Sequence, residues 1–185
     1  MLAYFTLLFL GSTFAQVILP GKCPAVSVKS DFDVQQYIGR WFEQRRYFAI
    51  FQFGLQCVTA TYSANNNGTV NIVNQGTYPL IGVKPSITGL AYAKTAEKAK
   101  LSVIFPSLPV HVEGSYWILD TDYISYAVVW SCTNISFISV RFAWILTRER
   151  HIPDDILEKA YKVLDKYKIN KWLFLKTDQT NCPTN

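Results

Sequence analysis

Between residues 40 and 146 the chain consists of short β-prone segments, each of which ends at a turn signal. Valine, isoleucine, threonine and aromatic residues dominate these segments, and prolines or the Asn67-Gly68 pair lie between them. The eight segments span residues 40–48, 58–62, 69–74, 86–92, 101–105, 116–120, 127–131 and 137–146. Even spacing of this kind is typical of a β-sandwich or an up-and-down barrel, so we expect an all-β domain.

A different periodicity follows the last of these segments. Apolar residues recur at helical spacing behind Pro153 and two acidic residues, which suit the first turn of a helix. This pattern predicts one amphipathic helix over residues 153–167. Its other face and end carry Lys159, Lys162, Lys166, Lys168 and Lys171. The lysines indicate a solvated face; the alternative is a weak contact with an anionic membrane or a lipoprotein.

The composition suits one globular domain with a sizeable core. Of its 185 residues, 50% are hydrophobic and 17% are charged. The net charge is +5, but the basic residues do not form the clustered stripe of a nucleic-acid-binding protein. We therefore expect no nucleic-acid partner. His111 and His151 are the two histidines of the chain, which disfavours a zinc site and most imidazole-based catalysis.

The N-terminus has the pattern of a secretory signal peptide. An apolar run from Leu2 to Leu10 precedes small residues at Thr13 and Ala15, which suit cleavage before Gln16. The alternative is an uncleaved membrane anchor, but the apolar run is well short of the ~20 residues that span a bilayer. We therefore predict a signal peptide over residues 1–15 and a single mature domain over residues 16–185 of a secreted, extracellular protein.

The four cysteines fit that compartment. Cys23, Cys57, Cys132 and Cys182 lie outside any CxxC spacing, so an oxidising environment favours two disulfides, for which three pairings are possible. Two sequons, at Asn67 and Asn134, are candidate glycosylation sites. Asn67 is the better candidate, because its Asn-rich context is typical of a hairpin tip.

Three short patterns in order give the chain a recognisable family signature. They are Gly39-x-Trp41 at the first strand, Thr121-Asp122-Tyr123 between two later strands, and Arg148 after the last strand. With the signal peptide and the late helix, they resemble the lipocalin family, and specifically its apolipoprotein D-like subgroup with bilin-binding and Lazarillo-like members. The resemblance implies an eight-stranded antiparallel up-and-down barrel with a C-terminal amphipathic helix packed on its outside.

The resemblance also implies roles for residues that maintain the fold. Trp41 would fill the closed end of the barrel, with the Arg148 guanidinium across its ring in a cation–π contact. The subgroup's disulfides would join Cys23 to Cys132 and Cys57 to Cys182, which would tie both ends of the chain to the barrel wall.

A ligand site inside the barrel follows from the same resemblance. An eight-stranded barrel is just wide enough to hold one small ligand. Tyr62, Asn74 and Trp144 match pocket positions of the subgroup, and would add a few polar groups to an apolar site. The chain departs from the subgroup at Gly76 and Tyr78, where charged residues are expected.

Alternation along the last strand extends this expectation. If Trp144 faces the interior, then Phe142 and Leu146 share that face, whereas the two residues between them face the helix. The competing interpretation is that Phe142 and Trp144 are ordinary barrel core. Trp117 either lines the site or caps a loop, and Tyr62 either contacts ligand or is an ordinary strand tyrosine.

The first loop, Phe48–Phe53, is unusually apolar for a connecting segment. A loop of this composition is either a lid over the ligand or a site that contacts a membrane or a lipoprotein. We favour the lid.

Motifs for catalysis are missing from the sequence. It contains no Gly-x-Ser-x-Gly elbow, HExxH motif, phosphate loop or nucleotide fingerprint. Two acidic pairs, Asp31/Asp33 and Asp154/Asp155, are explained by capping. We therefore predict a carrier and no enzyme, with no cofactor and no metal. Its ligand would be a small hydrophobic molecule such as a lipid, fatty acid, steroid, retinoid or bilin. The alternative is a cell-surface or lipoprotein interaction module with an incidental cavity.

Overall fold

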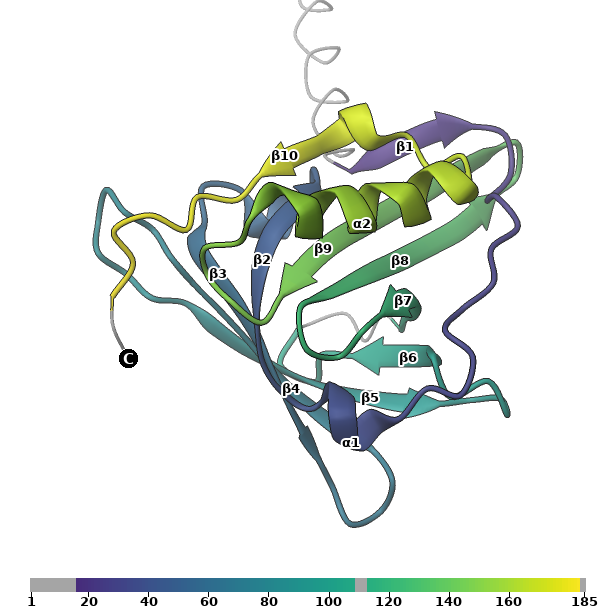
Figure 1. Cartoon of the computed structure of the whole chain (residues 1–185), viewed down its shortest axis with the longest axis horizontal. Coiled ribbons are helices and arrows are strands. Elements are labelled where there is room, and N and C mark those ends of the chain that lie inside the picture. Colours follow the sequence, from purple (N-terminus) through teal and green to yellow (C-terminus); the bar gives the residue numbers. More distant parts are fainter. Residues whose placement is uncertain (1–15, 109–112, 184–185) are drawn as a thin grey trace, which may run out of the picture.

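The computed structural model describes residues 16–108 and 113–183 (Figure 1). Its strands are β1 (Val17–Pro20), β2 (Gly39–Tyr47), β3 (Gln56–Ala64), β4 (Val70–Thr77), β5 (Ser86–Ala93), β6 (Lys100–Ile104), β7 (Gly114–Thr121), β8 (Tyr126–Ile135), β9 (Ile138–Thr147) and β10 (Phe174–Lys176). Its helices are α1 (Val34–Tyr37) and α2 (Asp154–Lys166), with 3-10 turns η1 (Ile50–Gln52) and η2 (Lys171–Leu173). Strands β2 to β9 pair in chain order, and β9 also pairs with β2, so these eight strands close an antiparallel barrel. The predicted fold class is confirmed.

Two short strands, β1 and β10, were not predicted, because three or four residues are too few to show a period. Their positions follow from strand edges that the barrel leaves free. β2 pairs with β9 only as far as Arg46 opposite Trp144, and β1 pairs with the unpaired start of β9. β10 pairs with the last residues of β2, beyond the point where β3 leaves it. Both strands thus satisfy backbone groups that would otherwise be unpaired.

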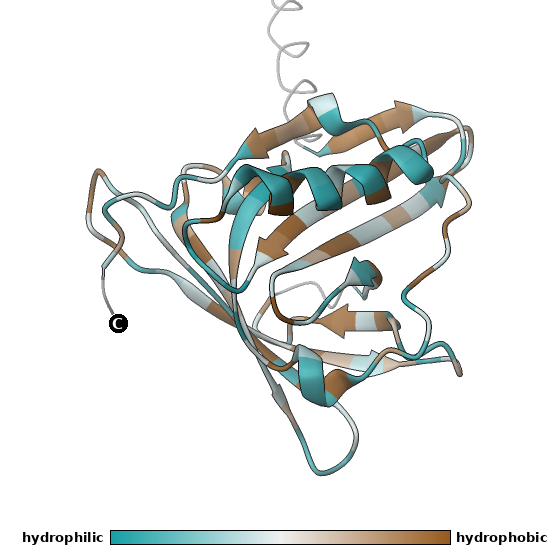
Figure 2. Ribbon diagram, in the orientation of Figure 1, coloured by the Kyte–Doolittle hydropathy of each residue, from teal (hydrophilic) through white to brown (hydrophobic). Residues whose placement is uncertain are grey.

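The apolar residues form two cores, one on each side of the barrel wall. On β9, Trp144 and Leu146 pack into the interior core, whereas Ala143 and Ile145 pack into the outer core beneath α2. This is the alternation that the sequence predicted. Ala160 lies on the barrel-facing side of α2 and is buried in the same outer core. Figure 2 shows the polar side of this helix turned away from the sheet.

The two ends of the barrel are built differently. Because the strands run up and down, the loops after β2, β4, β6 and β8 lie at one end, which we call the mouth. The loops after β3, β5 and β7 lie at the other end, which we call the closed end, together with α1 (Figure 1). Asp33 caps α1 by accepting a hydrogen bond from the backbone N–H of Gln35.

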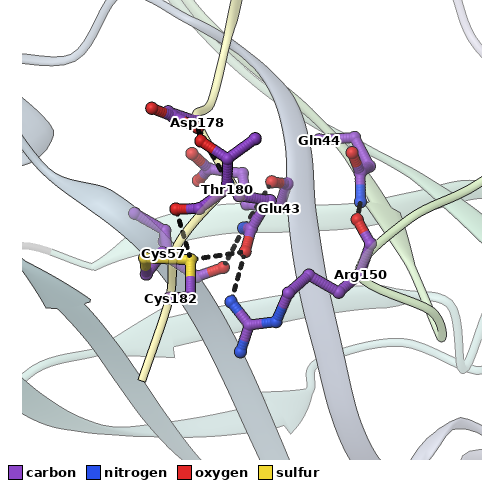
Figure 3. Close-up of a disulfide and its surroundings, with 9 residues drawn as sticks. Glu43, Gln44, Cys57, Arg150, Asp178, Thr180 and Cys182 are labelled. Carbon is purple, nitrogen blue, oxygen red and sulfur yellow. Dashed lines mark hydrogen bonds between the residues drawn. A yellow bond between two sulfur atoms is a disulfide. The ribbon is translucent and has the colours of Figure 1, made fainter. Parts of the chain in front are cut away.

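Two disulfides join Cys23 to Cys132 and Cys57 to Cys182, the pairing that the family resemblance implies. The second one holds the C-terminal segment in the gap between β2 and β3 (Figure 3). Within this gap the amide of Gln179 donates to the carbonyl groups of Glu43 on β2 and Val58 on β3, at 2.9 and 2.8 Å. The C-terminal segment therefore replaces the missing ladder between these two strands.

The predicted signal peptide, residues 1–15, lies outside the described residues, as does His111. In the described part of the chain, neither helix combines the length and the apolar character that a membrane-spanning helix needs.

Candidate functional site

Trp41 and Arg148 fill the closed end. The indole of Trp41 is fully buried, and its Nε1 donates to the carbonyl of Tyr37 at 2.8 Å. The guanidinium of Arg148 lies 3.9 Å from the centre of the Trp41 ring. The same guanidinium donates to the backbone carbonyls of Gln36, Tyr37, Arg40 and Tyr123, at 2.8 to 3.3 Å. One side chain thus ties together α1, β2 and the turn after β7.

The remaining signature residues shape this end. Gly39 has a φ of +100°, and a Cβ placed there would lie 3.1 Å from Nη1 of Arg148, so a side chain would be strained and crowded. Thr121 donates to the carbonyl of Tyr126 at 2.6 Å. The carboxylate of Asp122 accepts hydrogen bonds from the backbone N–H groups of residues 124–126. These residues build the closed end and leave the interior face to other side chains.

Three tyrosine hydroxyls meet inside the barrel just above Trp41. They belong to Tyr37, Tyr62 and Tyr116, which we call the tyrosine trio and which come from α1, β3 and β7. The Tyr116 oxygen lies 3.0 Å from that of Tyr37 and 2.6 Å from that of Tyr62. Burial raises the pKa of all three phenols well above the usual value, so they are neutral at physiological pH.

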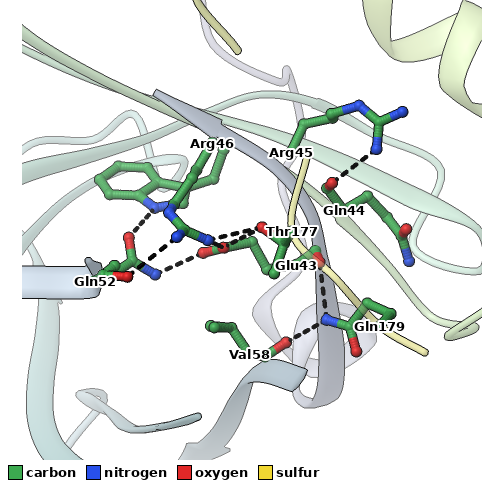
Figure 4. A network of polar contacts seen from close by, with 9 residues as sticks. Glu43, Gln44, Arg45, Arg46, Gln52, Val58, Thr177 and Gln179 are labelled. Carbon is green, nitrogen blue, oxygen red and sulfur yellow. Dashed lines mark hydrogen bonds and ion pairs between the residues drawn. The ribbon is translucent and has the colours of Figure 1, made fainter. Parts of the chain in front are cut away.

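Five residues form a polar network on the interior side of the wall near the mouth. This mouth network comprises Glu43, Arg46, Gln52, Trp144 and Thr177 (Figure 4). The buried carboxylate of Glu43 accepts from Arg46, Gln52 and Thr177, each at 2.6 Å. A charge this deeply buried needs several charge-assisted bonds, and here it has them.

Gln52 connects the network to the first loop. Its side-chain oxygen accepts from the indole Nε1 of Trp144 at 3.0 Å, and its backbone carbonyl accepts from Arg46 at 3.1 Å. Trp144 stacks on Phe142 with ring centres 5.9 Å apart, and Phe142 lies 6.0 Å from Phe51. A row of aromatic rings therefore runs from the interior wall to the first loop.

The other predicted ligand-contact residues divide between the two faces of the wall. Tyr62 and Leu146 belong to the interior core. Asn74 is partly buried and shares the interior face, because it pairs with Ala60 and follows Ile72 by two residues, and both of these lie in the interior core.

Trp117 is a correction to the sequence-based site. Its side chain packs against the outer core beneath α2, with the Lys100 ammonium 5.2 Å from its ring centre. Tyr116 and Ile118, its neighbours on β7, face the interior instead. The physical reason is that β7 is apolar on both faces, since α2 covers the outside, so its sequence did not reveal which face was inner. Tyr116 on the same strand was missed for the same reason. Tyr37 and the Glu43–Arg46 pair were also missed, because no sequence pattern indicated that they are buried.

The first loop leaves large apolar side chains uncovered. Ile50, Phe51 and Phe53 are 52%, 59% and 65% exposed, although Gln52 between them is tied to the wall. The predicted glycosylation site Asn67 lies in the exposed turn between β3 and β4. Asn134 is exposed near the end of β8, and its side-chain oxygen accepts from the backbone N–H of Cys23 at 2.7 Å.

Comparisons with known proteins agree with this architecture. The sequence model of the lipocalin / cytosolic fatty-acid binding protein family matches residues 38–181. Apolipoprotein D of Cavia porcellus is 39% identical over 169 residues, which cover 88% of this chain and 85% of the relative. The Lazarillo protein of Schistocerca americana is 32% identical over 184 residues, covering 92% and 85%.

A solved structure shows the same fold. Lobster apocrustacyanin A1 superimposes with a TM-score of 0.79 at 24% identity, covering 90% of this chain and 93% of the lobster chain. The closed eight-stranded barrel and its outer helix agree with these matches. The chain belongs to the lipocalin family.

Proposed function

We propose that this protein is a secreted carrier of a small hydrophobic ligand, such as a lipid, fatty acid, steroid, retinoid or bilin, which it holds inside the barrel. The observation that carries the proposal is the interior face. Its core consists of apolar side chains between the mouth network and the closed end, and the tyrosine trio and Asn74 add polar groups to it. Burial of apolar ligand surface there would supply the affinity, at ~25 cal/mol per Å², and the few polar groups would orient the ligand.

Secretion and the lack of catalysis are parts of the same proposal. Residues 1–15 would be removed as a signal peptide, and the two disulfides fit an oxidising compartment. Asn67 and Asn134 would be glycosylated. The interior polar groups are phenols, an amide and a fully bonded ion pair, none arranged as a nucleophile with its base. The ligand would therefore leave unchanged.

Tryptophan fluorescence tests the carrier function. Delipidated protein is titrated with a fatty acid, a steroid, a retinoid and biliverdin, and the wild type is compared with Trp144→Phe and Trp117→Phe. We expect saturable quenching by at least one ligand at micromolar concentration or below. The quenching should shrink in Trp144→Phe, whose indole faces the interior, and persist in Trp117→Phe, whose indole faces α2. Absence of saturable quenching by all four ligands would overturn the proposal.

A second candidate function rests on the exposed apolar side chains of the mouth. All four mouth loops carry them: Ile50, Phe51, Phe53, Leu80, Ile81, Val83, Leu108, Ile135 and Phe137. Such a collection at one end favours contact of the mouth with a membrane or a lipoprotein surface, through which an apolar ligand could pass without crossing water. The first loop would then be a contact site instead of a lid.

Vesicle flotation distinguishes these roles of the loop. Wild-type protein is mixed with phosphatidylcholine vesicles and compared with Phe51→Ser/Phe53→Ser. Ile124→Ser is the matched control, because Ile124 is 80% exposed at the closed end. Loss of flotation in the loop variant alone would support the surface contact. Flotation of neither the wild type nor the control would contradict it and leave the loop as a lid.

A further inference from the structure

A cleft with a positively charged lining lies on the outer side of the barrel wall. Trp41 packs into the interior core, so Arg40 beside it on β2 points outward, and its side chain is exposed. The cleft has a volume of about 380 Å³, within the range of small-molecule sites. We call it the cationic cleft; its lining includes Arg40, Arg150, His151, Gln179, Asn181 and Pro183.

Arg150 is held in place by its surroundings. Its guanidinium lies 4.7 Å from the centre of the Phe42 ring, and its Nη1 donates to Oε1 of Gln179 at 2.9 Å. The Gln179 amide cannot be reversed, because its Nε2 donates to two backbone carbonyls. Gln44 donates to the carbonyl of Arg150 at 3.0 Å, which fixes the turn after β9. Figure 3 shows the Arg150 guanidinium turned toward the Cys57–Cys182 disulfide.

The described residues supply this cleft with positive charge and no counter-charge. No carboxylate among them lines the cleft, and none forms an ion pair with Arg40, Arg150 or His151. Asp178 lies in the same C-terminal segment, but its Oδ1 accepts from the backbone N–H and the hydroxyl of Thr180. A guanidinium has five N–H donors, and the side-chain contacts of the described residues use one from Arg150 and none from Arg40.

The two guanidinium groups repel each other. Burial lowers the pKa of Arg150, and the positive charge of Arg40 lowers it further. Arg150 is nevertheless fixed beside Arg40 by Phe42 and Gln179. An anion between the two guanidinium groups would remove the repulsion and would accept N–H groups that the described contacts leave unused.

We propose that the cationic cleft is a second binding site, which binds a phosphate group either free or as a monoester of a small molecule. Planar guanidinium groups form paired hydrogen bonds with phosphate oxygens, and two of them match the charge of a phosphate dianion better than that of a carboxylate. The side chains of His151 and Asn181 add further donors. Because this site lies outside the barrel, the inference does not depend on the carrier function.

Isothermal titration calorimetry at constant ionic strength tests the site with three probes: inorganic phosphate, glycerol 3-phosphate and acetate. We expect the phosphate probes to bind with a Kd of ~1 mM or tighter. Acetate carries a single charge and should bind at least about tenfold more weakly. Equal affinities of the two phosphate probes would indicate a site for the phosphate group alone, whereas tighter binding of the ester would indicate a phosphorylated molecule.

Arg40→Gln is the test variant, because it removes one charge from the cleft and, among the described contacts, no side-chain hydrogen bond. Arg45→Gln is the matched control, since it removes the same charge from the same strand outside the cleft. We expect Arg40→Gln to weaken phosphate binding by about tenfold or more. Arg45→Gln should change it by less than about twofold, because salt screens distant charges.

Thermal unfolding gives a readout that needs no ligand. In phosphate-free buffer Arg40→Glu should unfold at a higher temperature than Arg40→Gln, because its carboxylate would pair with Arg150. An equal or lower midpoint would contradict the repulsion from which the site is inferred. In calorimetry, no saturable phosphate binding by the wild type, or equal binding by the wild type and Arg40→Gln, would overturn the inference. Neither result bears on the carrier function, whose ligand lies inside the barrel.

Discussion

The closed end and the mouth of this barrel are stabilised by different means. At the closed end Trp41 is fully buried and Arg148 covers its ring. The guanidinium of Arg148 donates hydrogen bonds to backbone carbonyls. At the mouth the wall depends on the buried Glu43–Arg46 ion pair, while large apolar side chains of the first loop remain exposed. Packing therefore closes one end of the barrel. At the other end polar bonds fix the wall, and the apolar side chains of the first loop stay exposed to contact with other molecules.

The covalent bonds follow the same division. Cys57 is the second residue of β3, which begins at the mouth, and Cys132 lies in the half of β8 that runs toward it. Both disulfides are therefore in the mouth half of the barrel, where the C-terminal segment replaces the ladder between β2 and β3. The mouth half, whose first loop leaves apolar side chains exposed, is therefore held by two disulfides and a buried ion pair.

The largest effect should come from removal of the closed-end packing. Trp41→Ala deletes a fully buried indole and leaves a cavity beneath Arg148, so we expect a loss of about 4 kcal/mol in the free energy of unfolding. Urea denaturation measures it. Trp172→Ala is the control, because Trp172 is 88% exposed and should change stability by less than about 0.5 kcal/mol. Similar losses of stability in both variants would contradict a special contribution of the closed-end packing to the stability of the fold.

The next largest effect concerns the mouth half. Cys57→Ala/Cys182→Ala frees the C-terminal segment from a cross-link between residues 125 apart, and we expect a loss of about 3 kcal/mol. Limited proteolysis should cleave this segment faster in the variant, with fragments read by mass spectrometry. If the segment stays as resistant as in the wild type, the hydrogen bonds of Gln179 are sufficient to hold it and the disulfide is not needed there.

A smaller loss is expected from the mouth network. Glu43→Gln keeps the shape of the side chain but leaves the buried Arg46 without its counter-charge, which should cost about 2 kcal/mol. Hydrogen exchange of the first loop should also accelerate, because Gln52 loses a charged partner. Glu158→Gln on the exposed side of α2 is the matched control. An unchanged exchange rate in the loop would show that the network does not restrain it.

The smallest effect is a pH dependence at the closed end. Although burial acts to raise the pKa of Asp122, hydrogen bonds from Ser125 and from three backbone N–H groups lower it below the usual value. The carboxylate therefore stabilises the fold above the unfolded-state pKa, near ~3.9, and this stabilisation is lost as the pH falls through the lower folded-state pKa. Urea denaturation at a series of pH values measures this. The free energy of unfolding of the wild type should be higher than that of Asp122→Asn at neutral pH, and the two values should converge in acid. A pH-independent difference would contradict this.

Much of this fold could be predicted from sequence, because its signals are local. Each β-prone segment corresponds to a strand, and most errors are at strand ends: residues 58–62 were predicted where β3 spans Gln56–Ala64. The alternation of β9 could be predicted, since the family resemblance implies that Trp144 faces inward, and this sets the side of the others. The helix predicted over 153–167 is α2, Asp154–Lys166.

The candidate site could be predicted only in part. Trp144 and Tyr62 lie on the interior face. Trp117 was expected either to line the site or to cap a loop, but it packs on the outer face, and β7 gave no signal of this because it is apolar on both sides. Glu43 and Arg46 gave no signal, since charged residues in a strand usually face solvent. Their burial depends on hydrogen bonds with Thr177, which is 134 residues from Glu43 in the chain, and with Gln52 in the first loop, and neither residue belongs to a recognisable motif.

The sequence by itself determined the number and order of the barrel strands, the outer helix and the residues of the closed end. These features could be determined because hydrophobic periodicity, turn residues and short motifs each depend on residues that are close together in the chain. The tertiary structure alone decided that three tyrosines from α1, β3 and β7 share their hydroxyl hydrogens, and that the C-terminal segment closes the wall. The physical reason is that each of these contacts joins residues that only closure of the barrel brings within hydrogen-bond distance.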